Sequence, residues 1–405
     1  MDVDDLVIGS GLSALGTVLG LTAHRDRRIA VLCGPTHGGF AYYDARRTVP
    51  CAFLGEGGMG SHWHGVIPTG RSGRFGTLDD AEVTAMFKRF YPHADLRTHL
   101  GRPGMFVPWR AIRPALELRR LAARLGDARL ILLPQAATKL QFDGCGARVE
   151  TAEGSHRGAR AWLAAGTLHT PALVEAFAPD ALRGLVSDHA FCYIGQVEGQ
   201  GRLRVERSRD GVFYPARHDP AMTALYSLRP AAFGYRQLDH GIEQRAVFGL
   251  PTGSALTKIA RRMSPGLMVE AFYNRFGFFS GTRLQSVYAQ VSVRDAYELR
   301  GGALPLVARS SVIRAATDAA RRAQPFAGLR ESRRVDLSLP GIHLHHSLDP
   351  AALLRAGING TDSPLQVIDA SVLTDIGPDH HSFKMLTSAH ERARRSGLPA
   401  AAAEP

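Results

Sequence analysis

The chain has 405 residues, enough for one large or two medium-sized domains with a substantial hydrophobic core. Hydrophobic residues make up 45% and charged residues 21%, which is typical of a soluble globular protein, and no apolar run of about 18 residues predicts a transmembrane span. The formal net charge is +12, but no helix-turn-helix, zinc-finger or RNP-like motif accompanies it. We therefore expect neither a nucleic-acid nor a membrane partner. A basic surface would still attract an anionic small-molecule substrate or an acidic carrier protein.

The N-terminal sequence MDVDDLVIG lacks the basic and apolar segments of an export signal, so we expect a cytoplasmic protein. The four cysteines show neither CxxC nor zinc-binding spacing and are expected to be free thiols in a reducing compartment, with no metal site. They are Cys33, Cys51, Cys145 and Cys192.

The first residues of the chain predict a strand, a glycine-rich turn, a helix and a second strand. Apolar runs at Leu6–Ile8 and Ile29–Leu32 are separated by GSGLSALG and by an apolar helical pattern that continues to Leu21. This order is typical of a Rossmann-like βαβ unit.

The glycine-rich turn has the pattern GxGxxA. Gly9 makes the turn, Gly11 lets the backbone approach a pyrophosphate, and the small Ala14 lets the helix pack closely on the strand. The N–H groups at the start of the helix then face the phosphates. One departure is Cys33, because this strand normally ends in Asp or Glu that binds the ribose hydroxyls, and a thiol is a poor hydrogen-bond partner. We expect adenosine binding to be weaker there or compensated elsewhere.

A second glycine-rich stretch, GEGGMGSHWHGVIPTG over residues 55–70, holds six glycines and two histidines. Glycine at this density indicates a backbone that approaches another group closely or takes positive φ angles.

The following segments alternate between helical and extended patterns. We expect helices over residues 79–90 and 112–125, with an extended FVPW segment between them. A strand, a hairpin and another strand follow from Leu130, and ARAWLAAGTLHTPALVEAF begins as a strand and turns into a helix.

The second half of the chain predicts a largely antiparallel sheet over residues 188–300, interrupted by a helix over 255–276. Its alternating aromatic residues are typical of a sheet core, and they are also candidates for the wall of a substrate site. Strands over 342–346 and 365–368 and a closing helix over 382–394 complete the expected elements.

Four segments in this order resemble the glucose–methanol–choline (GMC) oxidoreductases, a family of FAD-dependent alcohol oxidases and dehydrogenases. They are GSGLSA, GEGGMGSHWHG, ARAWLAAGTLHTP and LQVIDASVLTDIGPDHHSFKMLTSAHERAR, and the pair Asp188-His189 is a weaker fifth match. The resemblance covers nearly the whole chain. It implies an α/β (α+β) fold, with a Rossmann-like FAD-binding domain and a second, largely antiparallel substrate domain.

The chain is short for this family, so we expect a trimmed substrate domain and lid. We assign residues 1–70, 125–180 and 335–395 to a discontinuous FAD-binding domain, and residues 71–124 and 181–334 to the substrate and lid domain. The tail, residues 396–405, is expected to be disordered.

The resemblance also implies which residues contact the cofactor. The glycine-rich stretch corresponds to the family's GxGGxS loop along the flavin, and the AAG segment and the IDAS segment follow it at the same site. The expected FAD contacts are Gly9, Gly11, Ala14, Gly57, Gly58, Ser61, His62, His64, Gly65, Ala165, Gly166 and Asp369, the last of these through its backbone.

His62 has three alternative roles. The run GGMGSHW is similar to the GGMSTHW of the pyranose 2-oxidases within this family, in which the histidine is joined covalently to the flavin 8α carbon. His62 matches that position, so a covalent bond, a non-covalent flavin contact and a purely structural role remain open.

The resemblance places two catalytic histidines near the C-terminus. Aligning SAHER with the family's "A-x-A-E-R" puts His381 at one position, with His380 as the alternative if the register slips. The other position falls on His345 or His346, although Leu348 stands where the family has a glycine. In an extended strand, His343 and His345 would share one face and His346 would lie on the other.

These residues predict an enzyme of specialised metabolism that oxidises a hydroxyl group to a carbonyl, in which histidine takes the hydroxyl proton and hydride passes to flavin N5. Because fold does not determine reaction, a flavin-dependent desaturase, cyclase or decarboxylase remains an alternative. A catalytically retired flavin-binding partner protein is a third alternative.

Overall fold

The computed structural model describes residues 1–43, 49–63, 65–70, 80–142, 146–199, 203–230, 272–273, 276–281, 283–300, 306–331 and 338–396. His64, Cys145, most of the predicted 255–276 helix and all but the first residue of the predicted tail lie outside these residues. None of the described helices has the length and apolar character that crossing a membrane requires.

The first sheet carries the predicted βαβ unit. Its strand order is β7 (Leu130–Leu133), β2 (Ile29–Leu32), β1 (Asp2–Ile8), β10 (Gly154–Leu163), β9 (Ala147–Thr151) and β8 (Lys139–Phe142), and β19 (Leu365–Val367) pairs with β10. Strands β7, β2, β1, β10 and β19 are parallel, whereas β9 and β8 continue the sheet as an antiparallel hairpin. The predicted α/β domain with a parallel sheet is therefore confirmed.

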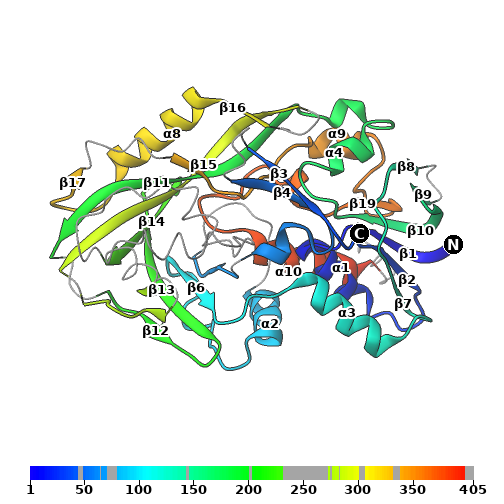
Figure 1. Cartoon of the computed structure of the whole chain (residues 1–405), viewed down its shortest axis with the longest axis horizontal. Coiled ribbons are helices and arrows are strands. Elements are labelled where there is room, and N and C mark those ends of the chain that lie inside the picture. Colours follow the sequence, from blue (N-terminus) through cyan, green and yellow to red (C-terminus); the bar gives the residue numbers. More distant parts are fainter. Residues whose placement is uncertain are drawn as a thin grey trace, which may run out of the picture.

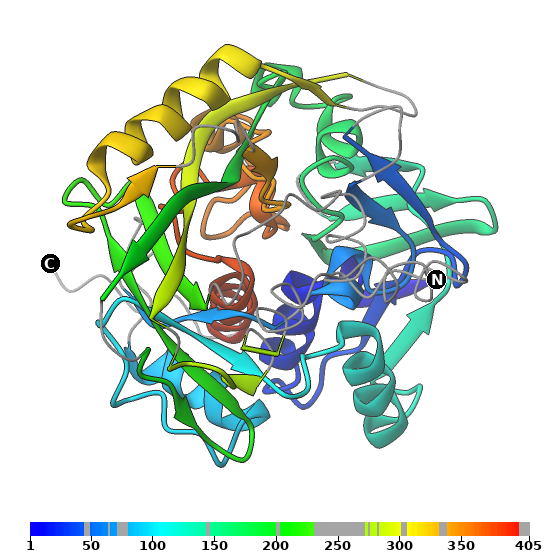
Figure 2. The same ribbon diagram turned by 60° about the vertical axis from the view of Figure 1, so that its left-hand side comes forward.

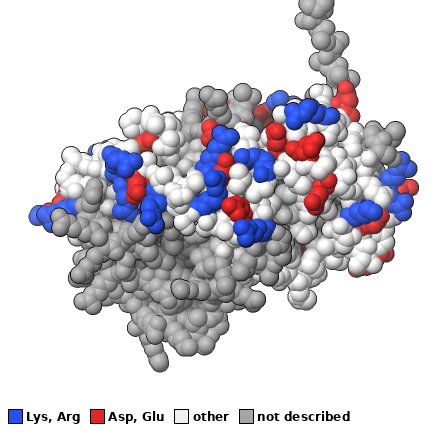
Figure 3. Space-filling model, turned by 90° about the horizontal axis from the view of Figure 1, so that it is seen from above, with Lys and Arg blue, Asp and Glu red and all other residues white. Residues whose placement is uncertain are grey.

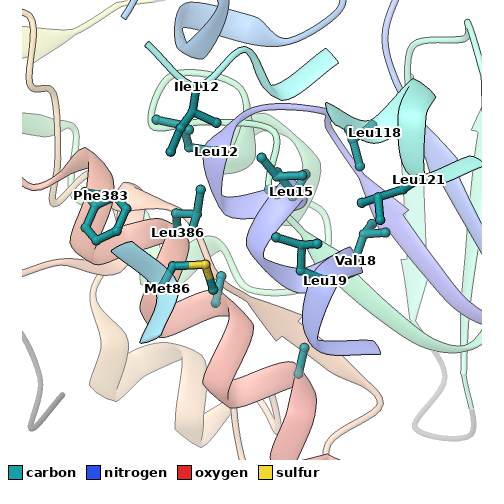
Figure 4. Close-up of a cluster of buried hydrophobic side chains, with 14 of the residues drawn as sticks. Leu12, Leu15, Val18, Leu19, Met86, Ile112, Leu118, Leu121, Phe383 and Leu386 are labelled. Atoms are coloured by element: carbon teal, nitrogen blue, oxygen red, sulfur yellow. The ribbon is translucent and has the colours of Figure 1, made fainter. Parts of the chain in front are cut away.

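Both faces of this sheet are covered, because side chains along a strand alternate between its faces and parallel strands are buried on both sides. Val7 of β1 packs in the cluster with α1 (Leu12–Leu21), α3 (Pro114–Leu125) and α10 (Ser382–Arg395), which Figure 4 shows. Leu6 and Ile8 pack in the opposite cluster with α4 (Thr170–Val174) and α9 (Pro350–Arg355). The Met86 side chain of α2 (Asp80–Phe90) joins the first cluster.

Helices α1 and α10 lie side by side at the centre of the molecule (Figures 1 and 2). A Cβ on Gly16 would overlap the carbonyl oxygen of Leu386. Only glycine permits this close approach of two backbones, and it brings the N-terminal and C-terminal parts of the chain together.

The second sheet is antiparallel, as predicted. Its order is β17 (Arg330–Glu331), β11 (Leu185–Glu198), β15 (Leu284–Leu299), β14 (Ala224–Pro230), β13 (Gly211–His218), β6 (Gly104–Pro108) and β5 (Ile67–Pro68), with β12 (Glu206–Arg207), β16 (Leu306–Ala308) and β18 (Ser338–Pro340) as side strands. Helix α8 (Ser310–Ala323) covers its outer face, as Figures 1 and 2 show. The hairpin β3 (Gly39–Tyr42) and β4 (Pro50–Leu54) forms a separate two-stranded sheet.

The predicted strand over residues 342–346 is wrong. Ile342 and His346 both have positive φ angles, +60° and +57°, which an extended strand does not allow. Only His345 forms a β-bridge in this segment, to Ser187 of β11. The proposed domain boundaries stay a prediction.

On the face of the molecule in Figure 3, basic and acidic side chains are interspersed rather than gathered into one basic field. The described part of this face therefore gives no support to docking of an acidic carrier protein there, and that partner also stays a prediction.

Candidate active site

Four segments of the chain meet at the carboxyl ends of the parallel strands. The Ser10 hydroxyl, in the turn after β1, donates to the Cys33 carbonyl (2.6 Å) and accepts from the backbone N–H of Gly57 (2.8 Å). Gly9 has φ +114°, and a Cβ on it would overlap the carbonyl oxygen of Ala164. The turn after β1, the end of β2, the glycine-rich stretch and the AAG segment thus share one edge of the sheet, where α/β proteins bind ligands.

The turn at the start of α1 is built as the sequence predicts. Gly11 is the N-cap, and Ala14 is fully buried against the sheet. Gly11 has no side chain to cap the helix, no capping bond to this end comes from the described residues, and its first turn contains no acidic residue. The N–H groups at this end of the helix are therefore available to an anionic ligand.

The glycine-rich stretch folds into a 3₁₀ turn, η1 (Gly58–His62), after β4. Gly57, Gly58 and Gly65 all have positive φ, as their spacing indicated, and the Ser61 hydroxyl donates within the loop to the Glu56 carbonyl (3.2 Å). This hydrogen bond closes the loop into a turn.

The His62 ring lies between Phe40 and Phe53 of the β3–β4 hairpin, with ring centroids 4.9 and 5.0 Å away. Burial, with a smaller effect of the Arg113 charge, lowers the pKa of His62, so the imidazole is neutral at neutral pH. Its buried Nε2 and the indole Nε1 of Trp63 have no hydrogen-bond partner among the described residues. Buried polar atoms are rarely left unpaired, so these two atoms fit contact with a bound group.

Asp369, at the end of β19, joins that strand to the AAG segment. Its carboxylate accepts hydrogen bonds from the Gly166 N–H (2.7 Å), the Thr170 hydroxyl (2.5 Å), and the N–H and hydroxyl of Ser371 (3.0 and 2.5 Å). Gly166 follows Ala165 with φ +91°. All four partners are donors, which suits an ionised carboxylate even though burial raises the pKa of Asp369.

Five imidazoles gather beside this edge and form what we call the histidine cluster: His189, His343, His345, His380 and His381. The rings of His345 and His381 have centroids 6.1 Å apart, and His189 of β11 lies 6.3 and 6.4 Å from them. Two bonds link the cluster to the AAG segment: the Thr167 hydroxyl donates to Leu344 O (2.8 Å), and the Ser347 hydroxyl donates to Thr167 O (2.7 Å).

Asp188 holds the backbone of the cluster in place. One oxygen of its buried carboxylate accepts from the N–H groups of His189 (2.8 Å) and His343 (2.7 Å), and the other accepts from the Tyr43 hydroxyl (2.8 Å). Because Tyr43 follows β3, this one side chain connects the hairpin, β11 and the histidine segment. In the sequence, the Asp188-His189 pair was only a weaker match to the family pattern.

The hydrogen bonds determine two tautomers, since a carbonyl oxygen only accepts. His345 Nδ1 lies 2.9 Å from His343 O, so Nδ1 carries the proton and Nε2 keeps a lone pair. His189 Nε2 donates to Gly377 O (2.7 Å), and its Nδ1 accepts from Gln290 Nε2 (3.2 Å). His189 therefore has both ring nitrogens occupied, whereas His345 keeps a lone pair on Nε2.

His346 lies apart from this cluster. Its N–H donates to Ala370 O (2.9 Å), and among the described residues its ring contacts none of the cluster's imidazoles. Burial and the charges of Arg183 and Arg294 lower its pKa to about 4. His345 rather than His346 thus joins His381.

Sequence reasoning missed two contributors to the site. Gln290 of β15 donates to Pro378 O (2.6 Å) as well as to His189. His218 of β13 lies 3.1 Å from the buried carboxylate of Asp379, just before His380. Both come from strands whose register against the C-terminal segment no sequence pattern encodes.

The face of the second sheet beside the cluster is aromatic. Phe191 and Tyr193 of β11 lie on the same side of the strand as His189 and pack against Tyr288 of β15, at 5.4 Å for each pair of rings. Arg229 lies over the Phe191 and Tyr288 rings. Tyr226, by contrast, belongs to the sheet core under α8, where its hydroxyl donates to Ala320 O (2.7 Å).

The buried histidines predict loss of stability in acid. Burial lowers the pKa of His189 to about 4 and of His345 to about 3, and that of His381 well below its usual value. Between about pH 6.5 and 4 the unfolded chain binds protons that the folded chain does not, so each such histidine costs about 1.4 kcal/mol of folding free energy per pH unit. Burial raises the pKa of Asp188 to about 6, so protonation of this carboxyl below pH 6 favours the folded chain. The effect of this one carboxyl is smaller than the opposite effect of the three histidines.

We therefore expect the melting temperature to fall steadily as the pH is lowered from 7 to 4.5, and His345→Gln to flatten that dependence. Calorimetry at a series of pH values measures it. A melting temperature that is independent of pH across this range would contradict the burial of neutral imidazoles.

The chain is similar to known proteins in its fold rather than in its sequence. No family model matches the chain, and a search of curated proteins finds no match. Pyridoxine 4-oxidase from Mesorbium loti is similar in structure, with a TM-score of 0.55 and 13% identity over 97% of this chain and 99% of that one. A fungal aryl-alcohol oxidase has a TM-score of 0.51 and 13% identity over 97% and 98%. The chain shares the fold of these oxidases along nearly its whole length, which confirms the predicted fold class.

Proposed function

We propose that the chain is an FAD-dependent oxidoreductase of the GMC type that oxidises a hydroxyl group of a small molecule to a carbonyl. The observation that carries the proposal is the buried histidine cluster beside the glycine-rich edge of the parallel sheet. The fold shared with an aryl-alcohol oxidase and a pyridoxine 4-oxidase supports it.

The residues at this edge fit FAD. The N-terminus of α1, whose N-cap Gly11 has no side chain, suits a pyrophosphate. His62 Nε2 and Trp63 Nε1 have no hydrogen-bond partner within the described part of the chain, which suits a polar ring system next to η1. When bound, FAD would supply the acceptor of the hydride that leaves the substrate carbon. We propose Gly9, Gly11, Ala14, Gly57 and Gly58 as the residues that let the backbone approach it.

His345 and His381 would handle the hydroxyl group. The lone pair on His345 Nε2 can take the hydroxyl proton, and its low pKa keeps this nitrogen unprotonated at neutral pH. His381, whose Nδ1 has no partner among the described residues, would orient the substrate oxygen. The aromatic face at Phe191 and Tyr288 suits a substrate with an apolar or aromatic body.

Anaerobic stopped-flow mixing with a panel of aliphatic and aromatic alcohols tests the proposal. We expect at least one alcohol to bleach the visible flavin band in a single exponential phase. A yellow protein that no alcohol bleaches would favour the desaturase, cyclase or decarboxylase alternatives. A protein that binds no flavin would overturn the assignment of both cofactor and activity.

His62 gives a separate prediction about flavin retention. Replacing it by alanine removes a buried ring nitrogen that has no hydrogen-bond partner among the residues described here, so we expect flavin to be lost at least tenfold more readily. Acid precipitation of the unmodified protein distinguishes covalent from non-covalent flavin binding. A yellow pellet indicates a covalent bond at His62 Nε2, and a yellow supernatant indicates a non-covalent contact. The matched control is His156→Ala, because His156 lies near the start of β10, at the opposite end of this strand from the AAG segment. Equal retention of flavin in both variants would contradict a flavin role for His62.

A further inference from the structure

The end of β2 lacks a side chain that can accept hydrogen bonds from a ribose. The Cys33 thiol is buried and turns back to the Val31 carbonyl at 3.6 Å, and the Cys33 carbonyl is occupied by Ser10. In dinucleotide-binding folds an acidic residue at this place accepts the ribose hydroxyls. A carboxylate for this position would have to come from another part of the chain.

Glu56 brings a carboxylate to the same place. The Glu56 N–H donates to Pro35 O (3.1 Å), and the backbone of its neighbour Gly55 lies against Gly34, directly after Cys33. Burial raises the pKa of the Cys33 thiol, and the Glu56 charge adds to this effect. Glu56 occupies the position before the paired glycines, Gly57 and Gly58, of the glycine-rich stretch.

Arg119 of α3 holds this carboxylate in a fixed orientation. Its Nε donates to Glu56 Oε1 at 2.9 Å and its Nη2 bonds to Oε2, the bidentate geometry that orients a carboxylate best. The Glu56 side chain is only 14% exposed, whereas Arg119 is 59% exposed and approaches from the solvent side. Each carboxylate oxygen keeps a further lone pair, enough to accept the two hydroxyls of a ribose.

We propose that Glu56 is the ribose-binding acid of this chain and replaces in space the residue that β2 lacks, with Arg119 as its positioning residue. The inference rests on the proposed function, since it concerns the adenosine half of the FAD that the site is proposed to bind. Because Glu56 neutralises Arg119, the site favours a free 2′-hydroxyl over a 2′-phosphate.

Calorimetric titration of the deflavinated full-length chain with ADP and with 2′-deoxy-ADP tests this assignment. We expect the unmodified chain to bind ADP about tenfold more tightly than 2′-deoxy-ADP, as one charge-assisted hydrogen bond allows. Glu56→Ala should weaken ADP binding by more than tenfold, because both ribose hydroxyls lose their acceptor. It should weaken 2′-deoxy-ADP binding less, because only the 3′-hydroxyl does, and so abolish the preference. Arg119→Ala should reduce the preference while Glu56 is still present.

The matched control is Glu117→Ala. Glu117 is an acidic residue of α3, the helix that carries Arg119, but it pairs with Arg120 and not with Arg119. It should keep the full preference for ADP, and the melting temperatures of all variants report that they are folded. If the Glu56→Ala chain still prefers ADP, or if the unmodified chain prefers a 2′-phosphorylated ADP, the role of Glu56 is wrong and the proposed function stands. If the unmodified chain binds neither ADP nor FAD, both are wrong.

Discussion

Replacing His381 by alanine is expected to lower kcat by about 10²–10⁴-fold while flavin remains bound, since proton transfer to His345 depends on the orientation of the substrate oxygen that we assign to His381. His381 is the N-cap of α10, and no capping bond from its side chain is lost. Its ring is buried, and its neutral imidazole faces His345 and His189. Single-turnover reduction of the flavin measures the chemical step separately from reoxidation.

Two further variants make this result specific. His345→Gln removes the nitrogen that we assign as proton acceptor and should be impaired to a similar degree. His346→Asn should retain activity within about tenfold, because asparagine tolerates the positive φ of this position and the ring lies outside the cluster. Equal losses in His345→Gln and His346→Asn, or full activity without His381, would contradict the assignment.

The parts of the fold that the sequence predicted are those with local signals. The βαβ unit follows from the apolar runs around GSGLSALG, and α10 follows from the helical period of residues 382–394. The glycine-rich stretch predicted positive φ angles, which Gly57, Gly58 and Gly65 adopt. In these segments the residues that determine the conformation are neighbours in sequence.

The histidine segment could not be predicted in this way. A run of alternating residues suggested a strand, but the Asp188 carboxylate accepts the His343 N–H and the His346 N–H bonds to Ala370, so tertiary bonds impose the two positive φ angles. His189 enters the cluster only because β11 pairs with residue 345 through Ser187. Likewise, Glu56 comes to lie beside Cys33 because Ser10 joins the glycine loop to β2. Contacts between distant segments determine each of these placements.

Asp369→Ala is expected to destabilise the protein by about 3 kcal/mol or more, because each buried donor that loses its acceptor costs about 1–3 kcal/mol. Four hydrogen bonds are lost together, and the Gly166 N–H and the Thr170 hydroxyl are left without their acceptor. Denaturant unfolding of the loaded and the flavin-free chain measures the effect.

The matched control is Asp349→Ala, at the N-cap of α9, where the carboxylate accepts a single bond from the Ala351 N–H (2.9 Å), and loss of such a cap costs about 1 kcal/mol. If Asp369 acts by joining β19 to the AAG segment, its loss destabilises the flavin-free chain as much as the loaded one, because all four donors belong to the protein. If stability is lost only in the loaded chain, Asp369 acts through the cofactor instead. If Asp369→Ala unfolds no more easily than Asp349→Ala, the four bonds do not stabilise this edge of the sheet.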